Sequence, residues 1–229
     1  MKRIGLLGGM SWESTALYYR LLNEGVAQRL GGLHSADCVV TSVDFAPVAE
    51  LQASGSWEQA AGLLADRARD LQAAGAEVVL LCTNTMHKVA TQIQDAIDVP
   101  LLNIIDTTAD AARRAGLSRL GLLATGFTME QSFYRERMES HGLEVVVPEA
   151  PSRALVHRVI YEELCRGIFE EASREEVRRV IGELGDRGAD GIILGCTEIE
   201  LLVGPADSPV PVLPTTALHA EAAIDAALR

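Results

Sequence analysis

The chain has 229 residues, of which 48% are hydrophobic and 23% are charged, and its formal net charge is −12. This composition predicts a globular protein with a sizeable core. The negative charge, together with the absence of a lysine- or arginine-rich run, argues against nucleic acid and anionic membranes as partners. No stretch is long enough to span a membrane, and the N-terminus has no signal-peptide pattern. The four cysteines show no metal-type spacing, so we expect a reduced, cytoplasmic protein with no metal site.

The first part of the chain alternates short apolar runs with longer segments of helical periodicity. The apolar runs are bounded by glycine and polar residues, which is typical of strands buried on both faces of a parallel sheet. The expected strands are residues 4–9, 36–44, 78–81 and 99–104, and the expected helices are residues 15–30, 57–74, 86–96 and 107–115.

From residue 120 the same pattern starts again. The run Leu120–Thr125 matches Ile4–Gly9, and a polar turn and a helix follow both. Later strands are expected at 144–147, before Cys196 and at 210–216, with helices at 130–141, 153–169, 173–185 and 217–229. Strands that alternate with helices predict parallel sheets with right-handed crossovers. We therefore predict an α/β fold of two pseudo-symmetric three-layer α/β/α lobes with mainly parallel sheets and a cleft between them. One continuous doubly wound sheet is the alternative.

Two segments of the chain align with each other without a gap. Residues 75–85 and 188–198 both begin with Gly-Ala and an acidic residue, continue with an apolar run and end in small polar residues. In this register Cys196 aligns with Thr83 and not with Cys82. A shift of one residue reverses the face of a strand, so Cys82 is predicted to be a small core residue. Ligands of parallel sheets lie beyond the carboxyl ends of the strands, so both polar ends should stand at a site.

Cys196 carries the clearest chemistry in this pattern. A thiol at the end of a buried strand, followed by Thr197 and Glu198, can act as a nucleophile or a base. The ordinary cysteine pKa of about 8.5 is lowered at a helix N-terminus, and we expect a helix turn just after Cys196. A buried structural cysteine is the alternative. The repeat favours chemistry, because two equivalent polar ends across a cleft suit a reaction on two faces of one carbon.

Three motifs taken together resemble those of the aspartate/glutamate racemase family, which works without pyridoxal phosphate. These motifs are Gly8–Ser14, Cys82–His87 and Gly195–Glu198. The resemblance covers essentially the whole chain. It implies two lobes related by pseudo-two-fold symmetry, usually in a homodimer, with the last strand and helix returning to the first lobe. The lobes would then be residues 1–98 plus 209–229 and residues 99–208. The resemblance also implies that the chain uses no cofactor and no metal.

In this family two cysteine thiols exchange the α-proton of an amino acid, one on each face. Here the usual Cys-Asn-Thr is replaced by Thr83-Asn84-Thr85. The resemblance therefore implies Thr83 and Cys196 as the catalytic pair, in which the hydroxyl can donate a proton but is a poor base at neutral pH. The substrate-binding residues that it implies are Met10, Ser11, Gln52, Asn84, Thr85, Thr128 and Thr197.

Supporting roles are expected for Glu198 and His87. Glu198 would orient or deprotonate Cys196, or cap the helix that follows. His87 would support a catalytic partner without contacting the substrate, or be purely structural. Helix capping is the alternative role for Asn84 and Thr85. No motif surrounds the remaining histidines, and no chemistry is predicted for His34, His141, His157 and His219.

The function predicted in this way is racemisation of an acidic amino acid, aspartate or glutamate, by removal and return of the α-proton. The unequal pair of Thr83 and Cys196 should favour one enantiomer. Related activities remain alternatives: hydantoin racemase, maleate isomerase or arylmalonate decarboxylase. A non-catalytic two-lobed amino-acid-binding protein is the alternative from another class, because a threonine stands where the family has a cysteine.

Overall fold

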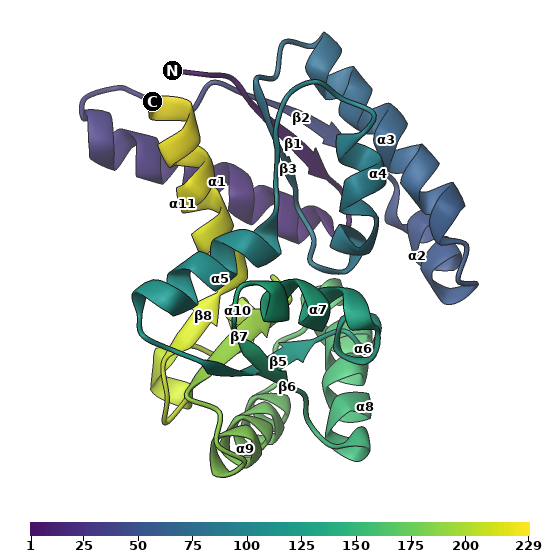
Figure 1. Cartoon of the computed structure of the whole chain (residues 1–229), viewed down its shortest axis with the longest axis vertical. Helices are drawn as coiled ribbons and strands as arrows, with labels where there is room; N and C mark the ends of the chain where they lie inside the picture. The colour runs from purple at the N-terminus through teal and green to yellow at the C-terminus, as the bar shows by residue number, and fades with distance from the viewer. The chain divides into compact units, whose positions relative to one another are not determined.

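The short apolar runs of the chain form two separate four-stranded parallel sheets, one in each of two units (Figure 1). The computed structural model describes residues 1–229. The first unit comprises Met1–Asn103 and His219–Arg229, and the second comprises Ile104–Leu218. The predicted α/β class with two parallel-sheet lobes is confirmed. None of the helices combines the length and the apolar character that crossing a membrane requires.

The first sheet has the strand order β2-β1-β3-β4. Its strands are β1 (Ile4–Gly8), β2 (Cys38–Ser42), β3 (Val78–Leu81) and β4 (Leu101–Leu102). The helices between them are α1 (Trp12–Leu30), α2 (Phe45–Ala53), α3 (Trp57–Ala73), the 3₁₀ helix η1 (Thr85–Val89) and α4 (Ala90–Gln94).

Alternate residues of β1 and β3 face opposite sides of this sheet and pack into two cores. One core joins Leu80 and Cys82 to Tyr18 of α1 and Ala223 of the last helix. The other joins Leu81 and its neighbours to α2, α3 and the α4 region. Helices therefore cover both faces of the sheet, as Figure 1 shows. Cys82 lies in the first of these cores, as its strand register predicts.

The second sheet has the strand order β6-β5-β7-β8. Its strands are β5 (Arg119–Ala124), β6 (Glu144–Val146), β7 (Gly191–Gly195) and β8 (Val212–Pro214). The helices from β4 onward are α5 (Ile104–Arg114), α6 (Gly126–Glu130), α7 (Ser132–Ser140), α8 (Ala150–Arg158), the π-helical η2 (Val159–Glu163), η3 (Leu164–Arg166), α9 (Glu171–Asp186), α10 (Ile199–Leu202), η4 (Pro205–Asp207) and α11 (Thr215–Leu228).

The two sheets have the same strand register as well as the same order. Ile4 of β1 lies opposite Val78 of β3, and Leu120 of β5 lies opposite Gly191 of β7. These are equivalent residues of the aligned segments, so the internal repeat extends to the pairing of individual residues. Counted from these pairs, Thr83 and Cys196 fall at the same position beyond their strands.

The boundaries of the two units differ from the predicted ones. The prediction assigned residues 99–208 to one lobe and 209–229 to the other. In the structure β4 pairs with β3, and the Val79 amide donates to the Pro100 carbonyl (2.9 Å). Likewise β8 pairs with β7. Each of these strands completes its own sheet, and the helix after it belongs to the other unit: α5 to the second and α11, from His219, to the first.

Two predicted helices are interrupted. The segment 130–141 is divided at Gln131, whose backbone is extended, into α6 and α7. The segment 153–169 passes from α8 into a π-helical turn and a 3₁₀ turn, and it ends at Gly167 with a left-handed φ of 71°. Glycine adopts this conformation without the steric penalty of a side chain, which explains the stop.

Candidate active site

The loop between β1 and α1 is wound around the side chain of Thr15. Thr15 Oγ1 accepts a hydrogen bond from the Gly9 amide (2.8 Å) and donates one to the Ser11 carbonyl (3.0 Å). Gly9 has a φ of 94°, and a Cβ there would lie 2.2 Å from a backbone oxygen of the next loop, so the position requires glycine. Ser11 Oγ accepts from the Ser14 amide (3.3 Å) and caps α1. The predicted binding residues Met10 and Ser11, which a cis peptide bond joins, thus lie in a closely hydrogen-bonded turn.

The end of β3 carries Thr83 and is held from two sides. Ser14 Oγ donates to the Cys82 carbonyl (3.2 Å), and His87 Nδ1 lies 2.7 Å from the Thr83 carbonyl oxygen. A carbonyl oxygen only accepts hydrogen bonds, so Nδ1 of His87 carries the ring proton. His87 is buried, as is Thr83. The predicted supporting residue therefore contacts the backbone of the predicted catalytic residue.

Gln52 of α2 belongs to the same group. Its side chain is buried, and its Nε2 lies 3.0 Å from Met86 Sδ. Met86 follows Thr85 in η1, so the structure brings Gln52 to the polar end of β3. The amide nitrogen is a donor, which suits the predicted contact with an acidic side chain.

The end of β7 places Cys196 beside a carboxylate. Cys196 Sγ lies 3.0 Å from Glu198 Oε2, so the thiol donates to the carboxylate. Burial raises the pKa of Cys196 well above its ordinary value, and the negative charge of Glu198 raises it further. The expectation that a helix N-terminus lowers this pKa is wrong. The following helix, α10, has only four residues, and the effect of burial outweighs it.

Cys82 differs from Cys196 in its surroundings. Its side chain is fully buried, and its Sγ donates weakly to the Leu80 carbonyl (3.8 Å) within the same strand. Burial alone raises the pKa of this thiol. Cys82 thus packs as a small apolar residue, whereas Cys196 has an acceptor for its proton.

The loop between β5 and α6 lies next to Cys196, because Ala124 of β5 pairs with Gly195 of β7. The hydroxyls of Thr125 and Thr128 lie 3.3 Å apart, and Thr128 is almost completely buried. The Gly126 amide donates to His157 Nδ1 (3.1 Å), which therefore carries no proton. Burial lowers the pKa of His157, in keeping with this acceptor role.

Tyr161 is a neighbour of Cys196 that sequence reasoning missed. It lies in the π-helical turn, and its pKa is raised first by burial and then by the charges of Cys196, Cys165 and Glu198. Its ring also lies 4.7 Å from that of His157, measured between centroids. A π-helical turn often marks a functional site, but the helical periodicity of residues 153–169 hides it.

Glu200 is a second neighbour that sequence reasoning missed. Its Oε1 accepts from the Thr216 amide (2.8 Å) and from Thr215 Oγ1 (3.3 Å). Thr215 Oγ1 also lies 2.9 Å from the Leu194 carbonyl of β7. Burial raises the pKa of Glu200 to about 7. The carboxylate thus connects α10, just after Cys196, to the start of α11.

The predicted site residues form two groups, one in each unit, and all are buried, with exposed fractions between 1% and 8%. The first group contains Met10, Ser11, Gln52, Thr83, Asn84, Thr85 and His87, and the second contains Thr128, Cys196, Thr197 and Glu198. Among residues 1–229 no cluster of three or more histidine, cysteine, aspartate or glutamate side chains could hold a metal ion. The donors in both groups are hydroxyls, amides, one imidazole and one thiol, which suit a small polar ligand.

Comparison with known proteins identifies the family. The family model described as Asp/Glu/Hydantoin racemase matches residues 7–223. The chain belongs to this family. The match spans the polar ends of β1, β3 and β7.

Solved structures of this family share the fold along the whole chain. A Yersinia pestis protein described as a candidate Asp/Glu racemase is 55% identical, with full coverage of both chains and a TM-score of 0.93. An aspartate racemase homologue from Pyrococcus horikoshii OT3 is 32% identical, again with full coverage of both, and has a TM-score of 0.87. Among curated proteins, the glutamate racemase of Hydrogenobaculum sp. is 26% identical over 129 residues, which is 55% of this chain and 48% of that protein. The chain thus spans about half the length of the curated relatives it matches.

Proposed function

We propose that the protein is a cofactor-independent racemase of an acidic amino acid, aspartate or glutamate. Cys196 exchanges the α-proton on one face of the substrate, and Thr83 serves the other face. One observation carries this proposal: the two sheets share one strand register, and it places a thiol with a carboxylate acceptor and a hydroxyl at equivalent strand ends. A family of racemases and relatives named for glutamate and aspartate support the substrate class.

On the Cys196 side, Glu198 supplies the acceptor for the thiol proton. The hydrogen bond from Sγ to Oε2 is a path by which the proton can pass to the carboxylate and leave a thiolate. Burial disfavours the thiolate in the free protein. A substrate ammonium group adds a positive charge nearby, which favours the thiolate when it is needed. The thiolate then takes the α-proton, and the reverse step returns one.

On the Thr83 side, the hydroxyl acts as a donor. A threonine hydroxyl has no useful ionisation near neutral pH, whereas a thiol can be activated. Thr83 can therefore give its hydroxyl proton to the strongly basic α-carbanion, after which its oxygen takes a proton from solvent, whereas the neutral hydroxyl cannot remove a proton. This difference makes the two faces of the substrate unequal.

Substrate binding falls to the remaining donors. The hydroxyls and amides of Asn84, Thr85 and Thr197 would hold the α-carboxylate, together with the backbone amides at Met10 and Ser11. Gln52 and Thr128 would contact the side-chain carboxylate. A buried carboxylate needs such donors, because an unpaired buried charge is costly. This need explains how an acidic protein can select an acidic substrate.

Exchange of the α-hydrogen in heavy water tests the proposal directly. The purified protein should place deuterium on the α-carbon of aspartate or glutamate, as followed by proton NMR, and a chelator should not stop it. Hydantoins and maleate serve as comparison substrates, and Cys196→Ala serves as the inactive control. Binding of an acidic amino acid without exchange of its α-hydrogen would contradict the proposal.

A non-catalytic amino-acid-binding protein is the second candidate. Two observations favour it: Thr83 stands at the position of the family's first cysteine, and burial raises the pKa of Cys196. Calorimetric binding of aspartate or glutamate, combined with no exchange, is the result that would establish this alternative.

A further inference from the structure

A buried polar network lies behind the end of β3, within the first unit. His219 of α11 is completely buried, with its Nδ1 2.8 Å from the Tyr18 hydroxyl and its Nε2 2.9 Å from the Leu102 carbonyl. The ring of His87 meets that of His219 edge to face, with centroids 5.9 Å apart and planes at 71°. His87 in turn donates to the Thr83 carbonyl (2.7 Å). The network therefore reaches from the last helix to the proposed catalytic threonine.

The hydrogen bonds fix the tautomer of each ring. The Leu102 carbonyl only accepts, so Nε2 of His219 carries a proton and Nδ1 accepts from the Tyr18 hydroxyl. The Thr83 carbonyl also only accepts, so His87 carries its proton on Nδ1. Both nitrogens of His219 are engaged, which prevents its ring from turning freely.

His219 is neutral in this network. Its pKa is lowered to about 3, first by burial and then by the neighbouring His87, against the opposing effect of the hydrogen bond to the Leu102 carbonyl. The groups that face it are Tyr18 from α1, His87 from η1 and Leu102 from β4. A neutral ring can therefore hold its place without a counter-ion.

The equivalent positions of the second unit keep the tyrosine but have no histidine. Counted from the paired strand residues, Tyr134 corresponds to Tyr18, and Thr108 corresponds to His219. Both tyrosines and Thr108 are completely buried, or nearly so. Only the first unit thus has a histidine at this position of the repeat, and only the first unit has threonine in place of the catalytic thiol.

We propose that His219 is a positioning residue for the Thr83 half of the reaction. With Tyr18 it holds the ring of His87, and His87 holds the Thr83 carbonyl, so that the Thr83 hydroxyl keeps a fixed direction. The inference deepens the proposed racemase function and rests on it. A hydroxyl without an activated partner depends on its placement more than a thiolate does, because orientation is the main contribution left to it.

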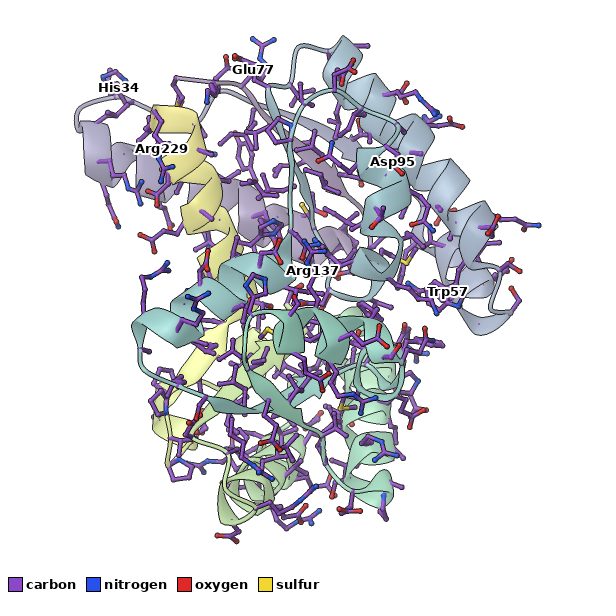
Figure 2. The ribbon with its side chains drawn as sticks, in the orientation of Figure 1. His34, Trp57, Glu77, Asp95, Arg137 and Arg229 are labelled. Carbon is purple, nitrogen blue, oxygen red and sulfur yellow. The ribbon has the colours of Figure 1, made fainter.

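The test uses the two faces of the substrate as separate readouts. His219→Gln and Tyr18→Phe are compared with His34→Gln, since His34 lies in the exposed loop after α1 (Figure 2). For each protein the initial deuterium exchange at the α-carbon is measured for both enantiomers in heavy water, together with the rate of inversion. Exchange through Cys196 should stay within about two-fold of the unaltered protein. Inversion should fall by roughly ten-fold or more in His219→Gln and by less in Tyr18→Phe.

Equal losses of deuterium exchange for the two enantiomers would show a merely structural role and overturn the inference. An unchanged rate of inversion in a folded His219→Gln protein would overturn it as well. A nitrogen-15 NMR spectrum of the histidine rings provides a readout that needs no activity. His87 should carry its proton on Nδ1 in the unaltered protein and become a mixture of tautomers in His219→Gln and in Tyr18→Phe. Absence of exchange for either enantiomer in the unaltered protein would defeat the racemase function alone. An unchanged His87 spectrum in both variants would defeat the positioning role.

Discussion

The ends of β3 and β7 occupy the same place in the repeat but differ in nearly every side chain. Thr83 corresponds to Cys196, and counted along the same register His87 corresponds to Glu200. Each of the latter two anchors its strand end, His87 by donating to the Thr83 carbonyl and Glu200 by accepting from the Thr216 amide. The repeat thus preserves the backbone, while its two copies carry different chemistry. One copy has a hydroxyl whose strand end is held by a histidine, and the other has a thiol beside the carboxyl groups of Glu198 and Glu200.

The largest effect should come from removing the thiol at the end of β7. Cys196→Ala should lower turnover by about 10³-fold or more, because it removes the thiolate that takes the α-proton in the proposed reaction. Cys82→Ala is the matched control, and we expect it to change turnover less than two-fold and to cost about 1 kcal/mol of packing. Racemisation rates and urea unfolding of both variants provide the measurement. Loss of turnover in a folded Cys82→Ala protein would mean that the wrong thiol has been assigned.

Much of this comparison could be predicted from the sequence. The gap-free alignment of two segments predicted the repeat, the side of Cys82 and the equivalence of Thr83 with Cys196. It could do so because successive strand residues face opposite sides of a sheet, so a shift of one residue between the aligned segments decides which side of the sheet a side chain faces.

Other features depend on tertiary contacts that the sequence does not display. Strands β4 and β8 are too short to reveal which sheet they join, so the predicted boundaries differ from those of the two units in the structure. The raised pKa of Cys196 follows from burial and from the direction of the Glu198 side chain. His219 has no local motif, and its partners Tyr18 and Leu102 lie far away in the chain.

An intermediate effect should come from giving the two strand ends the same chemistry. In the unaltered protein, the enantiomer whose hydrogen faces Cys196 should gain deuterium well before its mirror image. Thr83→Cys should lower the ratio of the faster to the slower exchange rate by roughly ten-fold, because a thiol can remove a proton where a hydroxyl cannot. Initial exchange rates for each enantiomer in heavy water measure this ratio, and Thr83→Ser is the matched control that keeps the hydroxyl.

Thermodynamics limits the form that this asymmetry can take. Enantiomers have equal free energies in water, so their kcat/KM values for racemisation must match. The asymmetry must then appear in kcat and KM separately, or in exchange without inversion. Equal exchange rates in the unaltered protein that Thr83→Cys leaves unchanged would show that Thr83 does not serve the second face.

The smallest effect should come from the anchor of β7, and it concerns stability. The pKa of Glu200 rises from its ordinary value of 4.5 to about 7 in the folded protein, first because of burial. Below about pH 4.5 the carboxyl is protonated in both the folded and unfolded chains, and its contribution to stability is fully present. Between these two values the unfolded chain releases the proton while the folded chain keeps it, so stability falls as pH rises and the contribution is lost above about pH 7. The contribution is on the order of 3 kcal/mol, since each pKa unit corresponds to about 1.4 kcal/mol.

Glu200→Gln should remove this part of the pH dependence of the unfolding free energy and leave the part that other titratable groups contribute. The amide keeps an oxygen that can accept from the Thr216 amide, so the anchor itself is retained. The difference in unfolding free energy between variant and unaltered protein should therefore grow in favour of the variant from about pH 5 to about pH 8. Hydrogen exchange of the Thr216 amide gives a local measure of the same change. A difference that stays constant over this range would show that Glu200 ionises in the folded protein as it does in water.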